Sequence, residues 1–213
     1  MFRELLQGSK HTLVHDAVDE ILRMLAQGHI MFQTSCAALR EGRPPEGGLP
    51  QDEVLNVGER IVRRMVFQHL IVNPKQDLST SVALLSVVHD VERIGDYAKS
   101  LVELSRWSTK NSSSALATLC SELHQMVEPE FGATLTALRD SDEEAARQVM
   151  RDHAQVKEFT DRMLEAAMEA EGREAIVYAV ASRYMRRVSG HLSNVATAVI
   201  NPVDQLAGKE APA

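Results

Sequence analysis

Two carboxylates stand four residues apart in the segment HDVERIGDYAKSL, residues 89–101. At helical spacing, Glu92 and Asp96 share one face with His89, within an arc of about 60°. Like charges at this spacing repel by roughly a few tenths of a kcal/mol. Gly95 costs about 1 kcal/mol relative to Ala in a helix, which favours close approach by a neighbouring helix or a ligand. A basic side chain, water or a metal ion must therefore compensate the carboxylates, and the chemistry of the site depends on which one does.

The preceding helical segment carries a matching polar face. Asp52, Asn56 and Glu59 lie on one arc together with Arg63. Two neighbouring helices that each present oxygen ligands can hold a hard or borderline cation between them. The alternative is structural: acidic residues at this spacing are common on solvated helices, and Arg63 or Arg93 could neutralise them as ion pairs.

Long helices must position these faces. Strand signals are almost absent, and clusters of Gly, Pro, Ser and Asn interrupt the helical patterns. Ser141 followed by Glu144 fits a capping box and predicts a helix start at that point. Long antiparallel helices with short links indicate an all-α bundle. The breaks predict six helices, at residues 2–40, 51–72, 76–107, 113–139, 142–170 and 174–207.

Composition limits the function. The net charge of −7 over 213 residues argues against direct nucleic-acid binding, because phosphate contacts need a basic surface. Cys36 and Cys120 lie far apart, which predicts reduced thiols rather than a disulfide or a cysteine-type zinc site. No apolar run is long enough to cross a bilayer and the start lacks a signal-peptide core, so we expect a cytoplasmic protein, peripheral to a membrane at most. The sequence lacks the Glu-x-x-His motif, which argues against a ferritin-like di-iron oxidase, and it lacks His-Glu-x-x-His, P-loop and dinucleotide motifs.

The segment VERIGDYAKSL, residues 91–101, resembles the signature of the PhoU family. DEVLNVGE (52–59) and NPKQDLSTSV (73–82) resemble the acidic stretch and the following helix start of that family. The resemblance implies two tandem three-helix bundles: a first PhoU repeat at 1–108, a second, degenerate repeat at 112–208, and a tail at 209–213. It also implies a bound metal cluster, with iron or zinc as the first candidates. Its ligands in the first repeat would be Asp52, Asn56, Glu59, Glu92 and Asp96.

The second repeat departs from the family pattern. Placing Val188 against Ile94 pairs Arg187 with Arg93, although this similarity is faint and does not establish a duplication by itself. At the acidic positions of the family this half carries basic residues or glycine, so a cation there would be repelled and a second cluster is not expected. We predict that ion pairs hold this half together or that it takes an anion. The residues concerned are His153, Lys157, Arg186 and Gly190, with Asp152 and Asp161 as the nearby acids.

The resemblance implies a non-enzymatic, metal-binding regulator of phosphate uptake and phosphate-starvation signalling. Such a protein would contact a sensor histidine kinase and a phosphate transporter, the latter being either a transporter ATPase or a carrier. A homodimer is one option for its oligomeric state. Two alternatives remain open: a helical adaptor of a different transporter, such as a sodium–phosphate carrier, and a metal-dependent helical-bundle enzyme.

Overall fold

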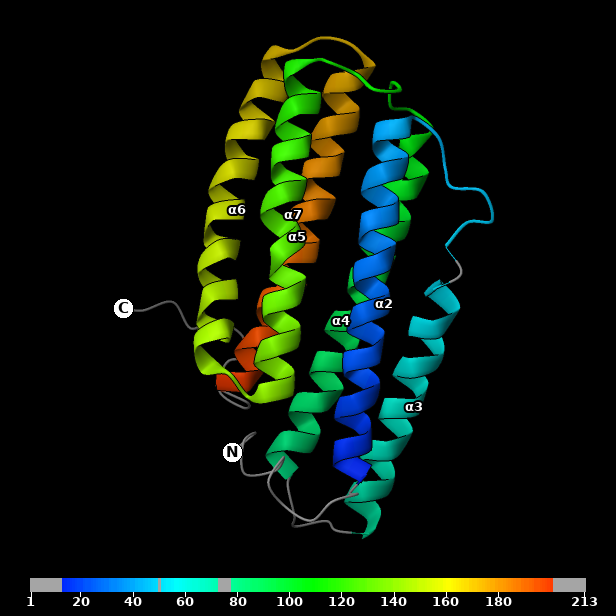
Figure 1. Cartoon of the computed structure of the whole chain (residues 1–213), viewed down its shortest axis with the longest axis vertical. Coiled ribbons are helices and arrows are strands. Elements are labelled where there is room, and N and C mark those ends of the chain that lie inside the picture. The colour runs from blue at the N-terminus through cyan, green and yellow to red at the C-terminus, as the bar shows by residue number, and fades with distance from the viewer. Residues whose placement is uncertain (1–12, 50, 73–77, 201–213) are drawn as a thin grey trace.

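The computed structural model describes residues 13–49, 51–72 and 78–200, and all regular secondary structure in these ranges is α-helical (Figure 1). The expected all-α fold is confirmed. Expected helix ends that fall inside the described ranges lie within about two residues of the observed ends. The expected starts at residues 2 and 76 and the expected end at residue 207 lie outside the described residues. The helices are α2 (Leu13–Glu41), α3 (Gln51–Val72), α4 (Leu78–Ser105), α5 (Ala115–Asp140), α6 (Glu143–Glu169) and α7 (Arg173–Ile200).

The junction between α5 and α6 corrects the predicted capping box by one residue. Asp142, not Ser141, caps α6, and its side chain accepts hydrogen bonds from the backbone N–H groups of Glu144 at 2.9 Å and Ala145 at 3.0 Å. Ser141 instead ends α5 in the left-handed conformation, with φ at 51°, and its N–H bonds to the carbonyl of Ala137. Because Ser141 closes one helix in this way, the cap of the next helix falls on its neighbour.

The six helices form two three-helix bundles in tandem. Helices α2, α3 and α4 pack together, as do α5, α6 and α7, and the two bundles join where α4 packs on α7 and α2 on α5. One continuous hydrophobic core runs through both, and the fully buried rings of Phe32 and Phe131 meet at 5.4 Å between their centroids. None of the described helices is long and apolar enough to cross a membrane.

Equivalent positions of the two repeats meet across the contact between α4 and α7. The alignment given above makes Tyr97 equivalent to His191, and Asp90 equivalent to Tyr184. The rings of Tyr97 and His191 stack at 5.6 Å. Asp90 lies 2.7 Å from His191, and the equivalent pair, Tyr184 and Tyr97, is also in contact, with ring centroids 6.0 Å apart. Such reciprocal contacts are those of a two-fold interface, so the geometry supports the alignment that the sequence left faint.

Candidate functional site

The predicted ligands lie on neighbouring faces of α3 and α4, and we call Asp52, Asn56, Glu59, Glu92 and Asp96 the acidic face. Lys99 bridges the two helices there, with its Nζ atom 2.9 Å from Oδ1 of Asp52 and 2.9 Å from Oδ1 of Asp96. The structure therefore brings Asp52 and Asp96 together as predicted. It does so through a lysine that the sequence reasoning did not name.

Two arginines also form ion pairs with carboxylates of the acidic face, as expected if the carboxylates are neutralised by basic side chains. Arg63 binds Glu59 at 2.7 Å and Arg93 binds Asp96 at 3.2 Å, each within one helix. Both arginines are about half exposed, so pairs of this kind contribute roughly 0–1 kcal/mol each. Glu92 is the exception, because no ion pair among the described residues includes it.

The electrostatics of the acidic face follow from these pairs. Partial burial, together with the nearby charges of Asp96 and Glu59, raises the pKa of Glu92. Burial opposes the charged form of Asp96 too, but Lys99 and Arg93 outweigh it and lower the pKa of that carboxyl. Burial likewise opposes the charged form of Lys99, yet Asp96 and Asp52 raise its pKa to about 12. Glu92 is thus the least compensated carboxylate of the set.

Gly95 provides the close approach that the sequence suggested. A Cβ atom at Gly95 would run into Cδ1 of Leu55, which is fully buried on α3. The glycine therefore lets α3 lie directly against α4 and aligns the two halves of the acidic face. The neighbour that needs this space is a helix rather than a ligand.

The donor chemistry of the acidic face suits a hard or borderline cation, since it consists of four carboxylates and an amide. Its side-chain arrangement is that of a salt-bridge cluster. Lys99 stands between Asp52 and Asp96, and the described residues contain no group of three or more His, Cys, Asp or Glu side chains placed to hold a metal ion. A metal ion would have to displace Lys99.

At the equivalent place in the second repeat the charges are reversed. Arg186 pairs with Asp161 at 2.5 Å, which is an ion pair of the kind expected in this half. Asp152 instead accepts a hydrogen bond from Gln148 at 2.7 Å. A cavity of about 300 Å³ opens beside Arg186, and its lining consists of His153, Lys157, Arg183, Arg186, Arg187 and Gly190.

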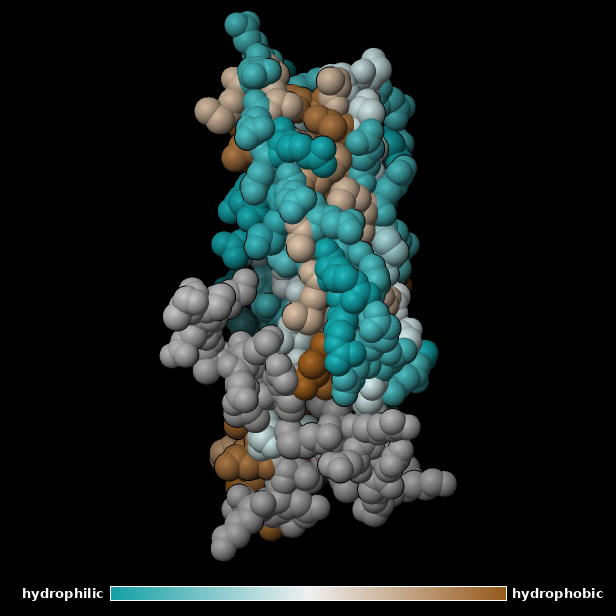
Figure 2. Space-filling view, turned by 90° about the vertical axis from the view of Figure 1, so that its left-hand side faces the viewer, coloured by the Kyte–Doolittle hydropathy of each residue, from teal (hydrophilic) through white to brown (hydrophobic). Residues whose placement is uncertain are grey.

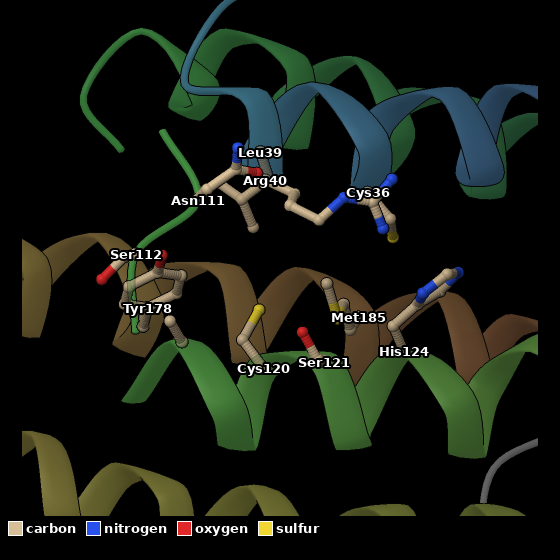
Figure 3. Close-up of a pocket in the computed structure, with 11 residues that line it drawn as sticks. Cys36, Leu39, Arg40, Asn111, Ser112, Cys120, Ser121, His124, Tyr178 and Met185 are labelled. Carbon is tan, nitrogen blue, oxygen red and sulfur yellow. The ribbon is translucent and has the colours of Figure 1, made fainter. Parts of the chain in front are cut away.

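A second cavity, of about 260 Å³, lies where α2 meets α5 and α7 (Figure 3). Cys36 on α2 and Cys120 on α5 line it from opposite sides, and both are free and buried. Burial raises the pKa of Cys120 to about 12 and that of Cys36 well above its ordinary value. A raised pKa keeps a thiol protonated and therefore a poor nucleophile, so the two cysteines are most simply structural groups of the core.

The fold and the paired sites define the class: an all-α protein of two equivalent three-helix repeats, each with a charged face between its second and third helices. The model of the PhoU domain matches residues 21–105 and again residues 120–199. The chain belongs to the PhoU family.

Solved structures agree with this assignment at the level of the fold. PhoU from Pseudomonas aeruginosa is similar with a TM-score of 0.78 and 22% identity, over 89% of this chain and 96% of that one. The phosphate transport system regulatory protein PhoU from Streptococcus pneumoniae is similar with a TM-score of 0.77 and 12% identity, over 89% of this chain and 94% of that one. No curated protein matches the chain.

Proposed function

We propose that this protein is a non-enzymatic regulator of phosphate uptake and phosphate-starvation signalling, which acts by contact with a phosphate transporter and a sensor histidine kinase. The observation that carries the proposal is the match of the PhoU domain to both repeats. The family is one of phosphate-transport regulators, and the similar protein from Streptococcus pneumoniae is a regulatory protein of a phosphate transport system. The place of action would be the cytoplasm, at the inner side of the membrane.

An apolar surface supports a role in protein contact. Large hydrophobic side chains are exposed at the end of α3 and the start of α4, with Phe67 and Ile71 each 64% exposed. Figure 2 shows hydrophobic atoms at the end of the molecule where these two helices meet. Apolar side chains gathered at one end of a helix pair are typical of a surface that another protein covers. The set, which we call the apolar end, is Phe67, Ile71, Val72, Leu78 and Val82.

Co-purification tests the partners. The full chain, tagged and expressed in its own host, should retain the ATPase of a phosphate transporter and a sensor histidine kinase. The double variant Phe67→Ser/Ile71→Ser should lose at least one of them. Ile176→Ser is the matched control, because Ile176 is 67% exposed but lies near the start of α7. Retention of neither partner by the wild-type chain would contradict the proposal.

The same experiment separates the alternatives. Retention of a sodium–phosphate carrier, with no transporter ATPase and no kinase, would favour the adaptor. Turnover in a screen of phosphate esters, abolished by Glu92→Gln, would favour a metal-dependent enzyme. If the protein is the proposed regulator, neither result is expected.

The acidic face is proposed as a site for a transition metal ion, iron or zinc. The support is its donor set and the poorly compensated charge of Glu92, whose raised pKa reflects burial and the nearby carboxylates. A metal ion bound there would supply positive charge and hold α3 to α4. Affinity should fall as the pH drops, because protonated carboxyls do not ligate.

Elemental analysis and melting curves decide between a metal site and a salt-bridge cluster. Glu92→Gln/Asp96→Asn should lose bound metal, and chelator should lower the melting temperature of the wild type but not that of this double variant. Lys99→Met should raise metal affinity, because it removes the cation that occupies Asp52 and Asp96. Lys110→Met is the control, since it removes an exposed lysine near Glu41. A metal-free wild type whose melting ignores chelator would show that the face is a salt-bridge cluster.

A further inference from the structure

The cavity between α6 and α7 is lined almost entirely by cations. One lysine and three arginines surround about 300 Å³, together with a histidine and a glycine, and no acidic side chain is part of the lining. This is unusual in a chain whose net charge is −7. We call it the basic cavity.

Most of these cations have no acidic partner. Arg186 pairs with Asp161. Within the described part of the chain, neither Lys157, Arg183 nor Arg187 takes part in an ion pair. Cations placed this close together repel one another unless an anion compensates them, and a concave site concentrates that potential.

Hydrogen bonds hold the side chains at the floor of the basic cavity in place. His153 is held by Ser189, with 2.8 Å between Nδ1 and Oγ, and Ser189 in turn donates to the buried carboxyl of Glu130 at 2.9 Å. A Cβ atom at Gly190 would meet Cε1 of His153 at 3.4 Å. The glycine therefore leaves the floor open, where the equivalent residue of the first repeat, Asp96, carries a side chain.

We propose that the basic cavity binds a phosphate-type oxyanion, either free phosphate or the phosphate group of a nucleotide. Guanidinium groups present paired N–H donors that match the oxygens of phosphate, and lysine adds a point charge. A cavity of about 300 Å³ is at the small end of ligand sites, which suits a small anion. The site depends on the cavity alone and not on the proposed regulatory role, so either can fail without the other.

Isothermal titration at fixed ionic strength tests the proposal, since salt screens charge–charge attraction. Inorganic phosphate and adenosine triphosphate are titrated separately into the full chain, which identifies the source of the phosphate group. Lys157→Gln and Arg187→Gln should each weaken binding by about tenfold. Arg173→Gln should leave it unchanged, because Arg173 lies at the start of the same helix as Arg187, away from the cavity.

A second pair of variants keeps the test sharp if one of these changes disturbs folding. Gly190→Asp introduces the carboxylate of the first repeat and should abolish binding, whereas Gly190→Ala adds only a methyl group in ordinary contact and should retain it. Saturable binding of either anion that follows this pattern supports the site. Absence of saturable binding of both anions, or binding equally strong in Lys157→Gln, Arg187→Gln and Gly190→Asp, would overturn it.

Discussion

Glu130 on α5 should make the stability of the protein fall as the pH rises through neutrality. The side chain is fully buried; Oε1 accepts a hydrogen bond from Ser189, and Oε2 has no hydrogen-bond partner in the described part of the chain. Burial raises the pKa of this carboxyl from 4.5 to about 8, against the opposing effect of the bond from Ser189, and the charge of Asp152 adds to the increase. The folded protein therefore holds Glu130 protonated at neutral pH.

The sign of the effect follows from linkage. A carboxyl whose pKa is higher in the folded state binds its proton more tightly there, so its contribution to stability is complete below pH 4.5. That contribution is lost as the pH rises to about 8. Between about pH 5.5 and about pH 8, the free energy of unfolding should lose about 3 kcal/mol from this group, to order of magnitude.

The variant Glu130→Gln isolates this contribution. Glutamine keeps the acceptor for Ser189 and does not ionise. Urea unfolding at a series of pH values should therefore give a flatter pH dependence for Glu130→Gln than for the wild type, by about 3 kcal/mol over that interval. His153 and Asp152 lie nearby and remain in both proteins, so the difference between the two curves belongs to Glu130.

Glu122→Gln is the matched control, because Glu122 is an exposed residue on the same helix. It should reproduce the pH dependence of the wild type. If Glu130→Gln and the wild type lose stability in parallel from pH 5.5 to pH 8, then Glu130 is ionised in the folded protein and the reasoning is refuted.

Two further predictions concern packing. Gly95→Ala should lower the free energy of unfolding by about 1–3 kcal/mol, because its Cβ would run into Leu55. Gly132→Ala should raise the free energy of unfolding by about 0.5–1 kcal/mol, because Gly132 is helical with open space around it. Chemical denaturation of both variants measures the contrast, and equal effects would contradict the prediction. Asp90→Ala should cost about 1–3 kcal/mol, because it leaves His191 and Asn194 without their hydrogen-bond partner in the contact between the repeats. An unchanged urea midpoint would show that these hydrogen bonds do not hold the repeats together.

Helix positions were largely predictable because the chain marks them locally. The Ser-rich break before Ala115 supplies a cap, Ser114, whose side chain accepts from the N–H of Ala117. The misplaced cap at Ser141 shows the limit of local reasoning. Ser141 and Asp142 are both good caps by residue type, and the conformation at the end of α5 decides between them.

The candidate sites were predictable in part. Helical spacing placed Glu92 and Asp96 on one face, and the repeat alignment placed Arg186 at the equivalent position of the second repeat, with the opposite charge. Lys99 was missed, although it lies three residues after Asp96 and such spacing brings side chains together. Its second partner, Asp52, is on another helix, and no local pattern states the register in which two helices pack.

The reciprocal contact of α4 with α7 explains how the two repeats can differ so much in charge. The residues that fix the register, such as Tyr97 and His191, face the partner repeat, whereas the acidic face and the basic cavity lie against α3 and α6. The presence of Arg186 where the first repeat has a carboxylate therefore leaves the interface between the repeats intact. Carboxylates attract cations and guanidinium groups attract anions, so one backbone arrangement presents two opposite chemistries. Titration with metal and titration with phosphate should consequently perturb different helix pairs.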